Sequence, residues 1–374
     1  MSSLPIHVGL DYHQQSVRVS LLSTAGERIA NRDCPNDWEA IARFSEGHGR
    51  VMGAAIEACT GAADLADELV LKAGWSVHLA HPGYVARMKQ TLDKTDSGDA
   101  HVLADLERVG YLPRVWLAPQ ETRELRRLVR YRQQLVNERR SRKLRITAIL
   151  RDLRAAPAAK MARWTQAWWK WLEEAPLSPQ GRWVIERHRK WLQLIASEIR
   201  EVESRLLRLT HQDGLVQRLL AYNGIGLVTA WVIRAEIGRF DRFRSGKQLS
   251  RFCGLSPCNA SSGSRQSDSG LIRAGNPLLR ATLIEAAHRL TRCDPRWGLL
   301  AARMRARGKA GSVVAAAVAN RWMRGLYYRV LDPTPASCQE DNTKHRGRRK
   351  DASNRKNAKD ASRTKNALKK RAAS

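Results

Sequence analysis

The sequence predicts a mixed α/β domain at its N-terminal end, followed by a mostly helical part and a basic tail. Three observations support this fold class. Runs of alternating apolar and polar residues open the chain, and strand-like and helix-like segments then follow one another to about residue 110. From residue 120 to 153 glycine is absent and apolar residues recur at helical spacing. Beyond Pro333 large apolar residues almost disappear.

The first domain is expected to open with an antiparallel meander, because period-two alternation broken by short polar turns is typical of half-buried strands. Asn36 and Asp37 can cap a following helix. The uninterrupted apolar run from 51 to 56 is typical of a buried central strand. The expected elements are strands at 6–10, 16–21, 27–32, 51–56 and 75–80, helices at about 38–45, 63–73 and 100–109, and a turn at 81–83.

Four carboxylates of this domain form a candidate metal site. Asp11 and Glu57 each follow a predicted strand, and Asp96 and Asp99 stand at the start of a predicted helix. Acids at strand ends converge on one sheet edge, and aspartates three residues apart share a helix face. Four oxygen ligands would suit one or two Mg²⁺ ions. The structural alternative makes them a helix cap, a first-turn charge and ordinary strand-end acids. The set as a whole favours the metal site.

Two heptad-like patterns predict a pair of long helices that form a coiled-coil linker. The first pattern runs from 125 to 153 and is interrupted by Arg132, Arg139 and Arg142, while the second runs from His188 to Leu209. The two helices could pair with each other or with a second subunit. The three arginines would then face an acid, a phosphate or solvent.

Six tryptophans lie between the two patterns or just inside the second one, interleaved with lysine and arginine. Such rings can stack the exposed bases of single-stranded RNA. They could equally form a small core where the helices turn. The six residues are Trp164, Trp168, Trp169, Trp171, Trp183 and Trp191.

Residues 215–238 indicate two apolar helices joined by the turn Asn-Gly-Ile-Gly at 223–226. The turn resembles that of a helix–hairpin–helix. In such a turn, Gly224 and Gly226 would present backbone N–H groups at a helix N-terminus to a phosphate.

The stretch from Gly254 to Arg280 is rich in serine and glycine and predicts a loop held between two helical segments. A serine hydroxyl beside arginines suits attack on a phosphodiester, because guanidinium groups stabilise the charge that develops on phosphate oxygens. Arg265, Arg273 and Arg280 are the candidate phosphate contacts. The alternative is a solvated linker.

The composition indicates a polyanionic partner, because the formal net charge is +30. Nucleic acid fits better than a membrane, since no apolar run approaches the ~20 residues that a spanning helix needs. The N-terminal residues lack the pattern of a secretory signal, and the 6 cysteines form no CxxC pair. A cytoplasmic protein with reduced thiols and no zinc site is therefore expected.

Several motifs together resemble the DEDD-type transposases of bacterial insertion sequences, a family of RNA-guided serine recombinases. They are Asp11, Glu57, KTDSGDA at 94–100, NGIG at 223–226, and the block at 254–280 that reads GLSPCNASSG and ends in IRAGNPLLR. The resemblance covers about residues 6–330, and the family's turn often has proline where this chain has Asn223.

The resemblance implies four parts: an RNase H-like domain at 1–112, a coiled-coil linker with a Trp-rich insertion at 113–213, a transposase domain at 214–332, and a disordered basic tail at 333–374. It implies that Asp11, Glu57, Asp96 and Asp99 hold Mg²⁺ and that Ser262, directly before Gly263, is the nucleophile; Ser261 is the adjacent alternative.

The resemblance further implies donor and target DNA, a structured guide RNA from the element, and a dimer or tetramer acting at the bacterial nucleoid. The main alternative is a metal-dependent RNase H-like nuclease or Holliday-junction resolvase without a covalent intermediate. A non-catalytic RNA-binding protein is disfavoured because all four acids are present.

Overall fold

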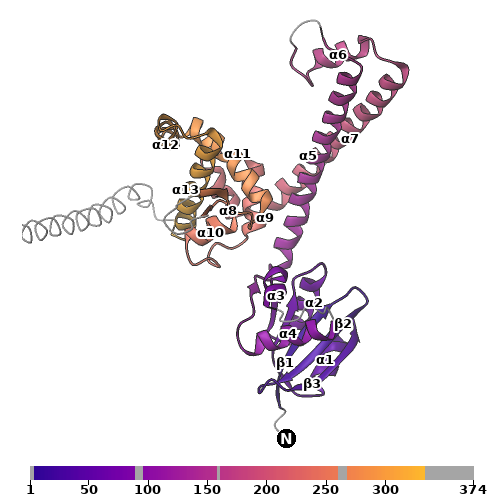
Figure 1. Cartoon of the computed structure of the whole chain (residues 1–374), viewed down its shortest axis with the longest axis vertical. Coiled ribbons are helices and arrows are strands. Elements are labelled where there is room, and N and C mark those ends of the chain that lie inside the picture. Colours follow the sequence, from indigo (N-terminus) through magenta and orange to yellow (C-terminus); the bar gives the residue numbers. More distant parts are fainter. Residues whose placement is uncertain (1–3, 89–95, 158–160, 260–267, 333–374) are drawn as a thin grey trace, which may run out of the picture. The chain divides into compact units, whose positions relative to one another are not determined.

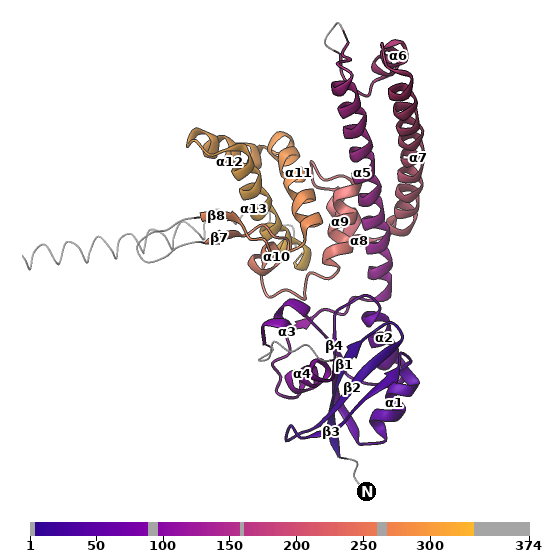
Figure 2. The same cartoon turned by 45° about the vertical axis from the view of Figure 1, so that its right-hand side comes forward.

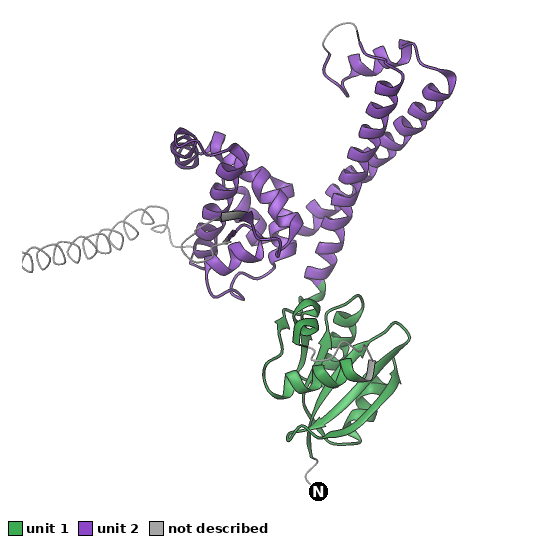
Figure 3. Ribbon diagram, in the orientation of Figure 1, with its two compact units in different colours: residues 1–120 green, residues 121–374 purple. Residues whose placement is uncertain are grey.

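The computed structural model describes residues 4–88, 96–157, 161–259 and 268–332 (Figure 1). The chain divides into two compact units, residues 1–120 and residues 121–374 (Figure 3). Three residues that the sequence singled out, Ser261, Ser262 and Arg265, lie outside the described residues, as does the basic tail.

The first unit contains one six-stranded mixed sheet with the strand order β3-β2-β1-β4-β5-β6. The antiparallel meander β1-β2-β3 is confirmed, β4 and β5 run parallel to β1, and β6 is antiparallel to β5. This arrangement is consistent with the expected RNase H-like domain. The strands are β1 (Pro5–Tyr12), β2 (Ser16–Ser23), β3 (Arg28–Pro35), β4 (Arg50–Glu57), β5 (Val77–Ala80) and β6 (Arg114–Val115).

Helices cover both faces of this sheet. On one face Val8 and Leu10 of β1 are fully buried against a core that includes Ile41 of α1 and Leu69 of α2. On the other face lies α4, whose backbone meets β1 at Gly9. The helices are α1 (Trp38–Glu46), α2 (Ala62–Lys72), α3 (Pro82–Met88) and α4 (Asp96–Arg108).

The local signals of the first unit are mostly confirmed. The side chain of Asp37 caps α1 by accepting a hydrogen bond from the Ala40 amide. The turn expected at 81–83 is wrong as stated, because α3 begins at Pro82. Proline is well tolerated in the first turn of a helix, where its missing N–H needs no partner.

The second unit begins with two long helices, α5 (Gln120–Asp152) and α7 (Pro179–Thr210), joined through α6 (Gln166–Glu174). They lie side by side and run antiparallel (Figures 1 and 2). Arg132 of α5 pairs with Glu203 of α7 at 2.6 Å, and the Arg142 guanidinium lies 5.2 Å from the Trp191 ring centroid. Two of the seam arginines therefore contact the facing helix of the same chain.

The seam of α7 agrees with the predicted pattern as far as Leu206, which is fully buried. Leu209 is 60% exposed, and Thr210 is buried instead. The Thr210 hydroxyl accepts a 2.8 Å hydrogen bond from the indole N–H of Trp231. A buried indole needs an acceptor, which explains why a polar residue occupies this position.

The tryptophans divide between the two alternatives. Trp168 of α6 is 2% exposed at the centre of a small core, and Trp164, Trp169 and Trp171 pack around it. Trp183 and Trp191 are 63% and 48% exposed. The helical hairpin formed by α5 and α7 therefore has its own aromatic core at the end where α6 joins the two helices. The rings of Trp183 and Trp191 lie at the surface.

A helical bundle completes the second unit around the apolar helix α9. Leu125 of α5 and Leu206 of α7 share its core. The expectation of a loop from 254 to 280 is wrong for 257–259 and 268–271, which form two short antiparallel strands, and for 277–280, where α11 begins (Figure 2). The elements are α8 (Gly214–Leu220), α9 (Leu227–Ile237), α10 (Gly246–Phe252), β7 (Pro257–Asn259), β8 (Asp268–Leu271), α11 (Pro277–Cys293), α12 (Pro295–Ala306) and α13 (Gly311–Leu331). Among the described residues, no helix is both long and apolar enough to cross a membrane.

Candidate active site

Asp11 and Glu57 lie at the same edge of the first unit's sheet. Leu10 of β1 pairs with Ile56 of β4 in the parallel register, so the next residue of each strand is an acid at the carboxyl end. The Asp11 side chain is only 16% exposed, and its carboxylate lies 3.4 Å from Nε2 of His13. Parallel strands thus bring together two carboxylates that are 46 residues apart by position number (57 − 11).

The pKa of the Cys59 thiol depends on the charge of both acids. Burial raises the pKa of Cys59, and the negative charges of Glu57 and Asp11 raise it further, although a hydrogen bond from the Ala62 backbone opposes the change. A carboxylate affects a thiol in this way only when it lies nearby. The two acids therefore share one electrostatic environment.

Helix α4 brings Asp99 toward this edge. A side chain at Gly9 would place its Cβ 1.9 Å from the Ala100 carbonyl oxygen and 2.6 Å from the Ala104 amide, so only glycine allows α4 to lie this close to β1. Arg108, at the other end of α4, donates to the Thr24 carbonyl beside the start of β1. The N-terminal end of α4, with Asp99, consequently points toward the carboxyl end of β1.

Asp11, Glu57 and Asp99, which we call the acidic edge, offer the hard oxygen donors that Mg²⁺ takes in proteins. Among the described side chains, no three His, Cys, Asp or Glu residues are close enough together to hold a metal ion. The side chain of Asp96, the fourth predicted ligand, is not among those described. The donor chemistry of the three described acids suits Mg²⁺, but these side chains alone do not place three ligands around one ion.

In the second unit, β7 and β8 form the stem of what we call the serine hairpin, residues 257–271. Gly254 and Gly275 close its base: both have positive φ, at 70° and 105°, and a Cβ at Gly275 would lie 2.7 Å from the Gly254 Cα. The Ile272 amide donates to the Ser256 carbonyl at 3.0 Å, and the Asn276 amide donates to the Phe252 carbonyl at 3.1 Å. The segments that enter and leave the stem are therefore held together next to the bundle.

Arg273 and Arg280, two predicted phosphate contacts, differ in their surroundings. Arg273 is exposed. The Arg280 guanidinium packs against Gly254 and donates to the Arg273 and Ala274 carbonyls at 3.3 and 3.1 Å. Arg280 thus braces the segment that leads out of the hairpin.

A buried acid that the sequence analysis did not single out connects this segment to two helices. Glu236 of α9 is 2% exposed and accepts two 2.8 Å hydrogen bonds from Arg130 of α5. It also accepts a 2.7 Å hydrogen bond from the Asn276 amide group, while the Asn276 side-chain oxygen caps α11. The one available signal was that Glu236 is the only acid in α9, whose other residues are nearly all apolar.

The Asn-Gly-Ile-Gly turn joins α8 to α9 as expected. Gly224 has φ +84, and Gly226 stands at the N-cap of α9 without a side-chain hydrogen bond. A pocket of about 560 Å³ opens at this helix end. Arg289 borders the pocket and donates to the Gly224 carbonyl at 3.0 Å and to the Thr229 hydroxyl at 2.9 Å. Backbone amides at a helix N-terminus beside an arginine suit an anion, and the acid that also lines the pocket, Glu203, is paired with Arg132.

Comparisons with known proteins agree with this geometry. Residues 8–154 match the model of DEDD transposases of the IS110 type, and residues 216–301 match the model of the transposase IS116/IS110/IS902 family. The chain is 30% identical over 295 residues to a protein of Pseudomonas aeruginosa named "Probable family 20 transposase", covering 73% of this chain and 82% of that protein. The chain belongs to the IS110 family of DEDD-type transposases.

Other family members are similar over shorter or more divergent stretches. The transposase for insertion sequence element IS1328 of Yersinia enterocolitica is 25% identical over 72% of this chain and 81% of its own length. The transposase for insertion sequence element IS1111A of Coxiella burnetii is 27% identical over 54% of this chain and 56% of its own length.

The stretches that the two family models match are separated by part of the helical hairpin of α5 and α7. The first covers the acidic edge and all of α5, and the second covers α9, Glu236 and the serine hairpin. Residues 155–215, which include α6, α7 and the tryptophan core, lie outside both matched stretches.

Proposed function

We propose that this transposase is a DNA recombinase that cuts and rejoins strands to move its own element. A structured RNA from the element would select the DNA sequence by base pairing. The protein would then recognise the shape and the phosphates of the nucleic acids. Donor and target DNA would be held by a dimer or tetramer in the bacterial cytoplasm, at the nucleoid. The net charge of +30 supports DNA and RNA as partners, because both are polyanions.

The observation that carries this proposal is the parallel register of β1 and β4. It aligns Asp11 and Glu57 at one edge, and the close approach of α4 at Gly9 directs Asp99 toward the same edge. Asp96 would complete the set. The four acids would hold Mg²⁺ against the scissile phosphate, and the metal would neutralise charge on the phosphate oxygens.

The proposed nucleophile is Ser262 in the serine hairpin, with Ser261 as the adjacent alternative. Its Oγ would form a bond to phosphorus as the bond to the 3′ oxygen breaks, and the hydroxyl proton would pass to that oxygen. The product is a phosphoserine intermediate and a free 3′-hydroxyl. Because the intermediate retains a phosphodiester bond, rejoining would need no ATP. The fixed stem of the hairpin supports this role, since a nucleophile needs a defined position.

Further contacts with nucleic acid would come from Arg265 and Arg273 of the serine stretch and from the turn at Gly224 and Gly226. Arg280 would position the hairpin through the two backbone carbonyls that it contacts. In this proposal α5 and α7 form the coiled-coil linker of 113–213, between the RNase H-like domain of 1–112 and the transposase domain of 214–332.

A reconstituted reaction tests the proposal. Full-length protein, Mg²⁺, a donor, a target and the structured transcript of the element's flanking DNA should yield joined products. Omission of the transcript should abolish them. Cleavage that occurs without the transcript and never proceeds to joined products would instead favour the second candidate, a metal-dependent nuclease or junction resolvase in which water attacks.

A further inference from the structure

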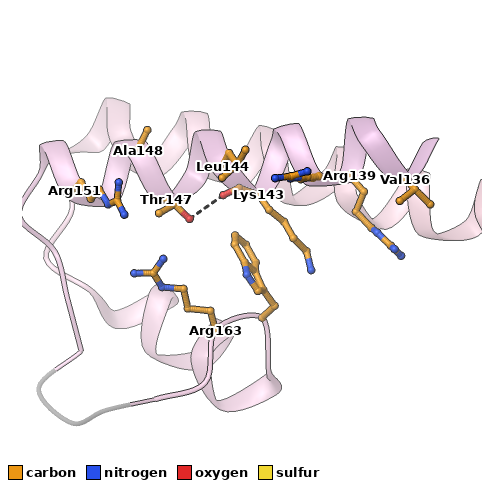
Figure 4. A pocket seen from close by; sticks show the side chains of 10 residues that line it. Val136, Arg139, Lys143, Leu144, Thr147, Ala148, Arg151 and Arg163 are labelled. Carbon is orange, nitrogen blue, oxygen red and sulfur yellow. Dashed lines mark hydrogen bonds between the residues drawn. The ribbon is translucent and has the colours of Figure 1, made fainter. Parts of the chain in front are cut away.

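A basic pocket of about 510 Å³ lies near the end of the helical hairpin, between α5 and residues 163–164 (Figure 4). Its volume is within the range of about 300–1,000 Å³ that is typical of ligand sites. The side chains of Lys143 and Arg163 extend toward the space between the two segments (Figure 4). We call this site the tip pocket. Its charged and aromatic lining consists of Arg139, Arg140, Lys143, Arg151, Arg163 and Trp164.

The charge of the tip pocket is uncompensated. Five cations line it and no acid does. Within the part of the chain that the structure describes, none of these five side chains forms an ion pair, whereas Arg132 on the same helix is paired with Glu203. Burial lowers the pKa of Lys143, and the charge of Arg139 lowers it further. Bringing like charges together costs free energy that a bound anion would recover.

The aromatic wall of the tip pocket is held in a strained position. Trp164 has φ +70°, a left-handed backbone conformation that is strained for a bulky residue. Its ring packs against Trp168 at 4.6 Å between centroids, and the Lys143 ammonium lies 4.9 Å from its centroid. The surrounding aromatic core thus fixes the ring beside the arginines.

We propose that the tip pocket binds an unpaired nucleotide of a single-stranded or looped nucleic acid, with its base on Trp164 and the flanking phosphates on the arginines. Base stacking on an aromatic ring combined with cations along the backbone is how proteins hold single strands. Lys143 is the group that moves aside, because its flexible chain lets the ammonium follow a phosphate. A paired base cannot reach the ring, so duplex DNA does not fill this site.

This inference rests on the proposed function only in requiring a nucleic-acid partner, and it does not depend on Ser262. The tip pocket includes Arg163 and Trp164, which lie outside both stretches matched by the family models. The other lining residues belong to α5, within the first matched stretch, so the pocket combines a matched helix with a segment that neither family model covers.

The first test removes charge at two exposed pocket arginines in the full-length protein. Arg140→Gln/Arg151→Gln should weaken binding of a labelled single-stranded RNA or DNA and lower the salt slope of log affinity by about 1.4, or about 0.7 per lost phosphate contact. The matched control is Arg200→Gln/Arg205→Gln, which removes two exposed charges from α7. Fluorescence anisotropy at several salt concentrations measures both pairs.

A second test concerns the ring. Trp164→Leu should weaken single-strand binding about fivefold or more, whereas Trp164→Phe should retain most of the affinity. Thermal unfolding of each variant separates loss of the aromatic core from loss of stacking. Crosslinking of a thiouracil-containing strand should label the segment that contains Trp164, and comparison of RNA with DNA strands identifies which polymer is the natural occupant.

Equal losses in the pocket and control pairs, or losses confined to duplex DNA, would overturn the proposal. The Ser262→Ala protein should show the same pocket-dependent binding as the unaltered protein. Failure of the proposed covalent chemistry would therefore leave this result unchanged, and failure of the tip pocket would leave the covalent chemistry untouched.

Discussion

The side-chain amide of Asn276 donates a 2.7 Å hydrogen bond to the buried carboxylate of Glu236. Asn276 directly follows Gly275, which closes the base of the serine hairpin. Glu236 in turn is held by Arg130 on the long helix α5. The position of the hairpin is thereby linked to both the bundle and the helical hairpin of the second unit.

Glu236→Gln should lower the free energy of unfolding by about 1–3 kcal/mol, because it weakens the hydrogen bonds that a buried charged acceptor makes to Arg130 and Asn276. It should also reduce strand joining, since the exit of the serine hairpin loses a fixed partner. Glu124→Gln is the control, because Glu124 forms an exposed pair with Arg127 and should change stability by no more than about 0.5 kcal/mol. Chemical denaturation measures both, and equal losses would remove Glu236 from this role.

Asp11→Asn should reduce recombination about 100-fold or more while leaving the fold intact, because it removes charge but little volume from the acidic edge. Isothermal titration should show weaker Mg²⁺ binding. Glu57→Gln and Asp99→Asn should behave alike, whereas Asp64→Asn, at an exposed position of α2, should not. Full activity in any of the first three variants would exclude that acid from the metal site.

The helical hairpin should lose stability in mild acid because of His188. Burial lowers the pKa of His188, and Arg142 and Arg145 lower it further. The unfolded chain, with an ordinary histidine pKa of about 6.5, therefore binds the proton more readily than the folded chain. Stability contributed by the neutral ring is present above pH ~6.5 and is lost as the pH falls below that value.

Replacement of His188 by glutamine should reduce this loss, and thermal unfolding across the pH range measures it. His211→Gln, at an exposed position just beyond the same helix, serves as the control. The account of His188 fails if both variants retain the full acid dependence of the unaltered protein.

Deletion of the chain after about Pro335 should leave strand chemistry intact and weaken overall binding to nucleic acid. Residues 341–374 contain 13 Lys or Arg and 3 Asp, and the sequence predicts that they bind through counterion release. The slope of log affinity against log salt should become shallower. An unchanged slope would show that the tail contributes nothing to binding, and failure to fold would show that it packs on the body.

The sequence predicted features that depend on local patterns. Alternation placed β1 to β3, the cap at Asp37 placed α1, and heptad spacing placed the buried side of α7 as far as Leu206. It also placed Asp11 and Glu57 at one edge, because parallel strands align their carboxyl ends whatever lies between them.

Features that depend on distant partners could not be predicted. Thr210 is buried in place of Leu209 because of Trp231, which lies 21 residues away. The strands β7 and β8 are too short to show alternation, and their pairing depends on the contact between Gly254 and Gly275. Glu236 is buried with partners on two other elements, which no local pattern records.

Capture of the covalent intermediate tests the central claim most directly. Full-length protein is incubated with Mg²⁺, the transcript and a labelled DNA substrate, then denatured and separated by gel. The account predicts a protein–DNA adduct that disappears in Ser262→Ala and persists in Ser261→Ala. Persistence in Ser262→Ala with loss in Ser261→Ala would move the nucleophile by one residue. No adduct in any protein, with metal-dependent cleavage retained in both variants, would contradict the account.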